Sequence, residues 1–385
     1  MQVPLRRQFT FQLQLNKGVI YPMRSNQAAI RALFLLLPAT IGTLRADAQG
    51  CIVARQCAPL FSADESAYMQ PYHWKFDLSL RVLDAARHYS GTVEQIIRQT
   101  NHNNVVNRQR LLDLGGTYAA SKQLNLSISV PVLLYGRWSL PLPTSPAGPR
   151  YAQNAKGVGD ISLSAKYWLL PVTTNPKQNI AIGVGVEAPT GSAHETSPFP
   201  NLQGNNPGVI RPVDQSIQPG LGAWAFPFEF QAFKSVKKVT FFASGTYLLT
   251  PTNINGTPSI VANLFDGVMP AGKEYQRFNS VPDQYLARIG ASMGLGPKKL
   301  GLTGELAWRV EGVPATDLVG NSDGFRRPGY AMFIEPGITW NHGNESWSIN
   351  VPVAYLRNRI KDSHGNAGDA TFADQFELIS YSHKY

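Results

Sequence analysis

From about residue 73 onward, the sequence carries twelve segments in which apolar and polar side chains alternate. In the first segment, Trp74, Phe76 and Leu78 share one face, and Lys75 and Asp77 share the other. A period of two predicts a strand with one apolar face. A closed barrel of such strands satisfies every backbone polar group inside lipid without any long apolar run. The pattern therefore predicts an all-β fold, a transmembrane antiparallel β-barrel of about 12 strands.

The expected strands and the connectors between them follow from this alternation. The strands lie at residues 73–83, 111–120, 123–134, 158–170, 178–189, 218–230, 238–249, 284–296, 300–310, 329–341, 345–356 and 373–385. Short connectors lie at 121–122, 171–177, 231–237, 297–299 and 342–344. Long connectors lie at 84–110, 135–157, 190–217, 250–283, 311–328 and 357–372. Short periplasmic turns that alternate with long extracellular loops are typical of outer-membrane barrels.

Aromatic residues gather near both ends of the apolar faces. Near the short connectors these are Trp74, Tyr167, Phe230, Phe241, Trp340, Trp347 and Tyr385. Near the long connectors they are Tyr247, Tyr285, Trp308, Tyr330 and Tyr355. Rings are expected where a barrel crosses the two membrane surfaces. A secreted β-sandwich or propeller also alternates, but it has no reason to place rings at both ends of its outward faces.

Four prolines oppose the assignment of central strands. Pro131, Pro227, Pro336 and Pro352 each remove one donor from a strand ladder. Bulges, which are common at barrel rims, can absorb most of these losses. Pro336 lies in the middle of its expected strand and is the hardest to accommodate.

The N-terminal region predicts export. Arg24 and Arg31, the apolar run at 32–44 and Ala46-Asp47-Ala48 match the three parts of a secretory signal. We expect residues 1–48 to form the signal, with Met23 as the true start. Residues 49–72 then form a periplasmic leader or plug, and residues 73–385 form the barrel.

The two cysteines both lie in this leader. Cys51 and Cys57 are expected to form a disulfide in an oxidising periplasm. Lipidation of Cys51 is the alternative, although the sequence before it lacks the leucine usual in that signal.

The net charge of the chain bears on which partners it could bind. Residues 1–48 hold six basic and one acidic residue, so the remainder has 29 basic and 24 acidic groups and a net charge of +5. This modest excess does not indicate nucleic-acid binding. Basic residues of the long connectors could bind phosphates of the cell-surface lipid, or pair with acids in their own loops. We expect outer-membrane lipids as a partner in either case.

Charged residues on the polar faces are the candidates for the barrel interior. The proposed lumen-lining residues are Lys75, Asp77, Arg81, Asp113, Asp160, Lys166, Glu187, Glu229, Arg288, Glu305, Arg309 and Glu335. With Lys238 and Asp374 they comprise six cations and eight anions, which does not suggest strong charge selection. Opposed pairs can be interior salt-bridge filling or the wall of a narrow path, because ionisable groups at membrane depth often mark pathways.

One stretch resembles a known family. Gly157-Val158-Gly159-Asp160-Ile161-Ser162-Leu163-Ser164-Ala165-Lys166-Tyr167, followed by Gly183, Gly185 and Pro189-Thr190-Gly191, is similar to the outer-membrane transporter family named for the meta-pathway of phenol degradation. The resemblance implies a channel for hydrophobic or aromatic compounds without defining the substrate. The final strand, with Ile379, Tyr381 and the terminal Tyr385, resembles the signal that the barrel-assembly machinery reads during insertion.

The sequence offers no motif for catalysis. Gly183-Val184-Gly185 lies in an expected strand and opens no helix, and no histidine has a metal-ligand spacing such as H-E-x-x-H. We therefore predict a passive outer-membrane channel for small molecules, including hydrophobic or aromatic ones, with no metal or cofactor. A barrel with a closed lumen and a structural or adhesive role is the alternative. An outer-membrane lipid hydrolase is a minor one.

Overall fold

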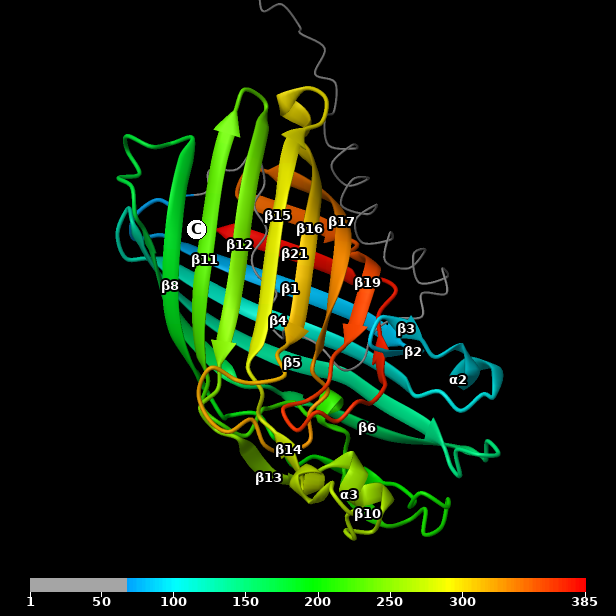
Figure 1. Cartoon of the computed structure of the whole chain (residues 1–385). Helices are drawn as coiled ribbons and strands as arrows, with labels where there is room; N and C mark the ends of the chain where they lie inside the picture. Colours follow the sequence, from blue (N-terminus) through cyan, green and yellow to red (C-terminus); the bar gives the residue numbers. More distant parts are fainter. Residues whose placement is uncertain (1–67) are drawn as a thin grey trace, which may run out of the picture. The chain divides into compact units, whose positions relative to one another are not determined.

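A closed sheet forms the body of the protein. The computed structural model describes residues 68–385, and among these no helix is long and apolar enough to cross a membrane. The sheet closes where β1 (Trp74–Ala85) pairs antiparallel with β21 (Glu377–Lys384), as Figure 1 shows. The predicted antiparallel barrel is confirmed.

The sheet has fourteen strand segments but twelve wall strands. Two wall strands are interrupted, one as β6 (Arg150–Val158) and β7 (Ile161–Trp168), the other as β18 (Glu345–Asn350) and β19 (Val353–Arg359). The remaining strands are β4 (Val106–Ala119), β5 (Leu124–Pro141), β8 (Gln178–Ala188), β11 (Phe226–Val236), β12 (Val239–Leu249), β15 (Gln284–Gly294), β16 (Leu302–Val313) and β17 (Gly329–His342). When each interrupted pair is counted once, the described wall has twelve strands, the number predicted.

Two of the four prolines, Pro131 and Pro336, lie where the neighbouring strand is interrupted, and Pro352 lies in one of these breaks. Pro131 of β5 lies beside the break between β6 and β7, where Gly159 donates to its carbonyl at 2.7 Å. Pro336 of β17 lies beside the break between β18 and β19, and Val351 donates to its carbonyl at 3.0 Å. Each missing donor thus meets a gap in the adjacent strand, so a proline is tolerated in the barrel wall.

The outward faces carry the apolar and aromatic residues. Leu163, Ile182 and Phe241 are each about half exposed, in agreement with a surface that lipid would cover. Rings touch one another along the rim formed by the short turns. Their centroid distances are 4.5 Å for Trp347–Tyr381, 4.4 Å for His383–Tyr385, 5.6 Å for Phe76–Tyr385 and 4.9 Å for Trp74–Tyr118. Trp340 on the same rim is buried rather than exposed, because its neighbours, including the stacked His342, cover it.

The sixth wall strand differs from its predicted range of 218–230. β11 starts at Phe226 and runs to Val236, so Phe230 lies in mid-strand and not beside a turn. The polar residues after Phe230 looked like a connector, but Gln231 is buried on the inner face and belongs to the strand. Residues 218–225 instead belong to a loop that returns to the barrel.

The long connectors contain short elements of their own, at the end of the barrel opposite the short turns (Figure 1). These are β2 (Arg87–Ser90), β3 (Val93–Glu94), α2 (Ile96–Thr100), β9 (Thr196–Pro198), β10 (Ile210–Pro212), η1 (Gln215–Ile217), β13 (Ile254–Pro258), α3 (Ile260–Leu264), η2 (Glu274–Arg277), β14 (Phe278–Ser280) and β20 (Ala370–Phe372). In the connector between β15 and β16, η3 (Lys298–Leu300) forms a short turn. Buried residues such as Trp138, Phe199 and Ile217 pack the loops into a core.

Candidate functional site: a hydroxyl-lined chamber in the barrel

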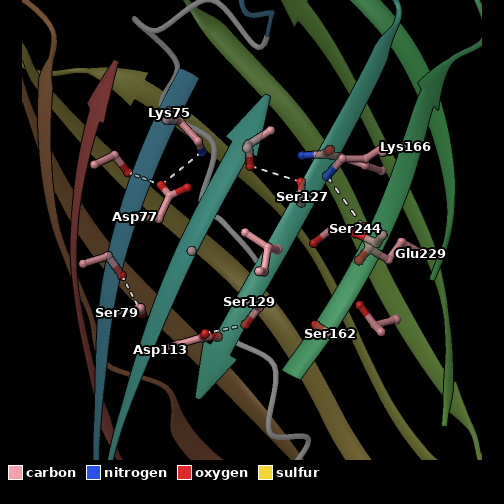
Figure 2. A pocket seen from close by; sticks show the side chains of 18 of the residues that line it. Lys75, Asp77, Ser79, Asp113, Ser127, Ser129, Ser162, Lys166, Glu229 and Ser244 are labelled. Atoms are coloured by element: carbon pink, nitrogen blue, oxygen red, sulfur yellow. Dashed lines mark hydrogen bonds and ion pairs between the residues drawn. The ribbon is translucent and has the colours of Figure 1, made fainter. Parts of the chain in front are cut away.

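A cavity of about 160 Å³ lies inside the barrel, between the short turns and mid-height. Most of the side chains that line it carry hydroxyl groups (Figure 2). They are Ser79, Thr117, Ser127, Ser129, Ser162, Ser164, Ser244, Thr246, Thr339, Ser346, Ser348, Ser380 and Ser382. We call this cavity the chamber. Small hydroxyl side chains leave space between opposite walls and offer both donors and acceptors to whatever fills it.

Pairs of these hydroxyls join adjacent strands. Ser79 and Ser380 lie 2.9 Å apart across β1 and β21, and Thr117 and Ser127 lie 3.1 Å apart across β4 and β5. The pairing follows from the period of two, which brings alternate residues of neighbouring strands to the same inner face. The hydroxyl lining is therefore a continuous surface across at least these four strands.

The chamber also holds charges of both signs, two cations and three anions. Lys75 contacts Asp77 at 3.1 Å, and Ser382 donates to the same carboxylate at 2.6 Å. Across the chamber, Lys166 lies 3.7 Å from Glu229. Asp113, which accepts from the Ser129 hydroxyl, is a third carboxylate of the lining, so the chamber walls carry both signs with a small excess of negative charge.

A belt of arginine and glutamate side chains lies inside the barrel next to the chamber. The Arg–Glu belt consists of Arg81, Arg288, Glu305, Arg309, Glu311 and Glu335. Arg81 of β1 reaches across three wall strands to Glu311 of β16 at 2.6 Å. Glu311 also accepts from Arg309 at 2.7 Å. None of the six side chains is more than 3% exposed, so the belt is shielded from water.

Each charged side chain of the belt has a partner of opposite charge within the belt. Arg288 lies 2.5 Å from both Glu305 and Glu335, and Arg309 lies 3.4 Å from Glu335. The guanidinium of Arg81 stacks over the Phe376 ring at 4.0 Å. Buried charges are tolerated only when partners satisfy them. The belt therefore links β1 with β15, β16 and β17 across part of the barrel interior through several charge-assisted bonds.

Asp160 fastens a long loop to the inner wall. Its carboxylate accepts from the backbone N–H of Gly191 at 2.9 Å and from that of Leu221 at 2.5 Å. A Cβ on Gly191 would lie 2.7 Å from the Cα of Gly159, and one on Gly220 would lie 2.3 Å from the carbonyl of Gly191. Only glycine permits backbones to approach so closely, which explains the glycines of the motif around Asp160.

A second anchor lies nearby. Arg327 contacts Asp214 at 2.6 Å, and the same carboxylate accepts from the Ser216 hydroxyl at 2.6 Å. Burial alone would raise the pKa of Asp214, but the Arg327 guanidinium and Ser216 outweigh it and hold this pKa below its usual value. An ion pair therefore fixes the loop that contains Asp214.

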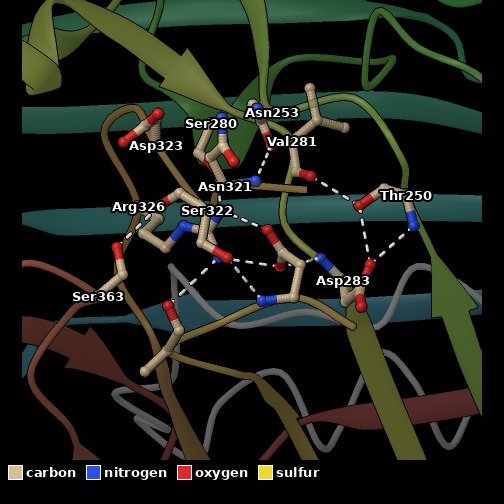
Figure 3. Close-up of polar contacts among 12 residues, drawn as sticks. Thr250, Asn253, Ser280, Val281, Asp283, Asn321, Ser322, Asp323, Arg326 and Ser363 are labelled. Carbon is tan, nitrogen blue, oxygen red and sulfur yellow. Dashed lines mark hydrogen bonds and ion pairs between the residues drawn. The ribbon is translucent and has the colours of Figure 1, made fainter. Parts of the chain in front are cut away.

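The other loops are joined by a polar network, shown in Figure 3. Arg326 donates to Asp317 and to Ser280, each at 2.6 Å. Thr250 donates through its hydroxyl to Val281 at 2.6 Å and through its backbone to Asp283 at 2.7 Å. These contacts fasten the long connectors 250–283 and 311–328 to each other.

At the end with the short turns, Tyr68 packs against the inner wall. Its ring lies 5.2 Å from that of Trp168 and 5.7 Å from that of Phe233. Asn179 donates to its hydroxyl at 2.8 Å. The described end of the expected leader is therefore attached to the barrel. Cys51 and Cys57, like the expected signal, lie outside the described residues.

The structure separates the twelve proposed lumen residues into three groups. Lys75, Asp77, Asp113, Lys166 and Glu229 line the chamber. Arg81, Arg288, Glu305, Arg309 and Glu335 belong to the belt. Asp160 anchors the loop, and Glu187 is buried where its backbone pairs with Ala225. The roles of these twelve residues in transport stay predictions.

Sequence reasoning missed Glu311 and the chamber hydroxyls. Glu311 lay one residue beyond the expected end of its strand, which continues to Val313. The alternating serines at 162 and 164, 346 and 348, and 380 and 382 were the signal for the chamber. Within residues 68–385 there is no group of three or more His, Cys, Asp or Glu side chains that could hold a metal ion.

No protein-family model matches this sequence, and no curated protein matches it. The structure is similar to that of an outer-membrane channel from Pseudomonas putida F1, with a TM-score of 0.52, 11% identity, and coverage of 85% of this chain and 100% of that one. A FadL homologue from Pseudomonas aeruginosa matches with a TM-score of 0.38 and 8% identity over 87% of this chain and 99% of that one. The toluene transporter TbuX from Ralstonia pickettii matches with a TM-score of 0.38 and 10% identity over 82% and 90%. At 11% identity, the likeness to the Pseudomonas putida channel establishes the outer-membrane barrel fold alone, and membership of the family suggested by the sequence stays a prediction.

Proposed function

We propose that the protein is a passive channel of the bacterial outer membrane that admits small molecules through the chamber. The single observation that supports this most strongly is the hydroxyl-lined cavity of about 160 Å³ in the interior of a twelve-stranded barrel. A barrel with a purely structural role has no need of open polar space, and its interior is expected to be filled by side chains.

The proposed location follows from the fold and from the N-terminus. An apolar outer surface with aromatic rims suits a bilayer, and the expected signal at 1–48 would export the chain. Insertion by the barrel-assembly machinery would use Ile379 and Tyr381, which face outward on β21, together with the exposed Tyr385.

The chamber lining favours solutes that carry hydroxyl groups. Serine and threonine can exchange hydrogen bonds with such a solute as it sheds water, whereas a pure hydrocarbon would leave these groups unpaired. We therefore propose small neutral hydroxylated molecules, aromatic alcohols included, in preference to the hydrocarbons that the sequence resemblance suggests. The paired charges of the chamber fit a neutral solute.

In this proposal both ends of the path are narrow at rest. The Arg–Glu belt and the loop held by Asp160 obstruct the path on the loop side, and Tyr68 occupies part of the mouth on the turn side. We propose that residues 49–72 act as a leader that restricts this mouth and that loop movement admits solute on the other side. No step of this passage requires catalysis.

A vesicle-swelling assay tests the proposal. Vesicles with residues 49–385, and others with a chain that lacks 49–72, are diluted into iso-osmotic erythritol, arabinose or stachyose. We expect swelling with the two small solutes, faster after the deletion, and none with stachyose. Swelling no faster than in protein-free vesicles for both chains would overturn the channel and favour a closed structural or adhesive barrel.

A further inference from the structure

Most arginines of the long connectors already have carboxylate partners. Arg87 pairs with Glu94 and Asp374, Arg98 pairs with Asp369, and Arg357 pairs with Asp374. These contacts, like those of Arg326 and Arg327, are internal to the loops. Their charges are therefore not available to a partner outside the protein.

A second group of cations lies on the outer face of β4, β5 and β6. We call it the outer basic patch, and it consists of Arg108, Arg110, Arg137, Arg150 and Lys156. In β5, Trp138 points inward to the loop core, so Arg137 next to it points outward. In β6, Tyr151 and Ala155 pack against the same core, so Arg150 and Lys156 point outward.

Cross-strand register brings these cations together. Arg108 lies directly opposite Arg137, and Arg110 lies opposite Tyr135. Facing like charges repel when nothing lies between them. Asp84 is the nearest outward acid, at 2.6 Å from Arg110 and 3.8 Å from Arg108. With Glu377 opposite Val82 as the other outward acid, five cations meet two anions and the patch carries a net charge of +3.

The patch begins where the apolar outer surface ends. Below the pair of Arg110 and Tyr135, the next outward pairs of β4 and β5 are Leu112 with Val132 and Leu114 with Val130. One two-residue step along the strand, about 6.6 Å, thus separates apolar pairs from the first cation. In a bilayer this is the level at which acyl chains give way to headgroups.

We infer that the outer basic patch binds the phosphate groups of a phosphorylated lipid in the outer leaflet, with its acyl chains on the apolar surface beneath. This inference rests on the proposed outer-membrane location but not on the proposed solute. Guanidinium groups bind phosphate through paired, charge-assisted hydrogen bonds. Arg108 is 51% exposed and can reach such a ligand. Bound phosphates would also relieve the repulsion between Arg108 and Arg137.

The test measures lipid affinity of residues 49–385 purified in a neutral detergent. Diphosphoryl lipid A, phosphatidylcholine and inorganic phosphate are titrated separately, with the thermal unfolding midpoint and native mass spectrometry as readouts. R108Q/R137Q is compared with K298Q/K299Q, which removes two exposed cations at the opposite rim. We expect R108Q/R137Q to weaken binding of diphosphoryl lipid A roughly tenfold and K298Q/K299Q to leave it unchanged.

Equal affinity in all three proteins would overturn the inference. Protection by inorganic phosphate as strong as that by lipid A would also overturn it, because the site would then not depend on the lipid. Vesicle swelling by R108Q/R137Q is expected to match that of the unmodified chain. Failure of the lipid site is thus distinguishable from failure of the channel.

Discussion

Replacement of Glu311 by glutamine should lower the free energy of unfolding by about 3–5 kcal/mol. Glu311 is fully buried and is the shared partner of Arg81 and Arg309. Its loss leaves two guanidiniums in a water-poor interior with their nearest counter-charge removed. Guanidinium-induced unfolding in lipid vesicles, followed by tryptophan fluorescence, measures the change.

Glu274→Gln is the control for this prediction, because Glu274 is an exposed loop residue. Its stability should stay within about 0.5 kcal/mol of the unmodified chain. Similar stabilities for the Glu311 and Glu274 variants would contradict this prediction and would show that the belt is more hydrated than its burial implies.

Replacement of Asp160 by alanine should cost about 3 kcal/mol and make the barrel more permeable. The substitution leaves the backbone N–H groups of Gly191 and Leu221 buried without their acceptor, and each such loss costs about 1–3 kcal/mol. Since these contacts hold the loop of residues 189–225 against the wall, we expect faster swelling in arabinose as well as a lower unfolding midpoint.

Thr190→Ala is the matched control in the same loop. The Thr190 hydroxyl accepts from the backbone N–H of Ile161 at 2.9 Å and donates to the Gly159 carbonyl at 3.1 Å, but the residue is exposed, so water can replace both partners. This variant should lose at most about 1 kcal/mol and swell at the normal rate. An Asp160→Ala variant as stable and as impermeable as Thr190→Ala would contradict the anchoring role.

The strands of the barrel wall were predictable because apolar side chains face the lipid and polar side chains face the interior, so the two kinds alternate along each strand. Lys75 and Asp77 were expected inside and Trp74 outside, and the register places them so, because one buried face fixes the whole strand. The sixth strand was placed too early in the sequence because the polar residues after Phe230 resembled a connector, and because Phe233 is an aromatic residue on the inner face, where it packs with Trp168 and Tyr68. Apolar clusters inside the barrel interrupt the alternation of apolar and polar residues from which the strand limits were inferred.

The belt and the loop core depend on contacts between residues distant in the sequence. Arg81 and Glu311 are 230 positions apart, and no local pattern joins them. The loops likewise looked structureless, yet they contain short strands and helices, because their apolar residues find one another only once the barrel brings the loop ends together. Asp160 was recognised as an interior group, but its use of two backbone donors follows from the folded loop alone.

The most direct test of the chamber as the solute path is chemical modification during single-channel recording. Ser164 lines the chamber and Leu163 beside it faces outward at 53% exposure, so Ser164→Cys and Leu163→Cys are compared in a background with Cys51 and Cys57 replaced by serine. A charged, membrane-impermeant methanethiosulfonate reagent is then added to the bathing solution. We expect a stepwise fall in conductance for Ser164→Cys and an unchanged conductance for Leu163→Cys. Conductance that is unaffected in both variants would contradict passage through the chamber.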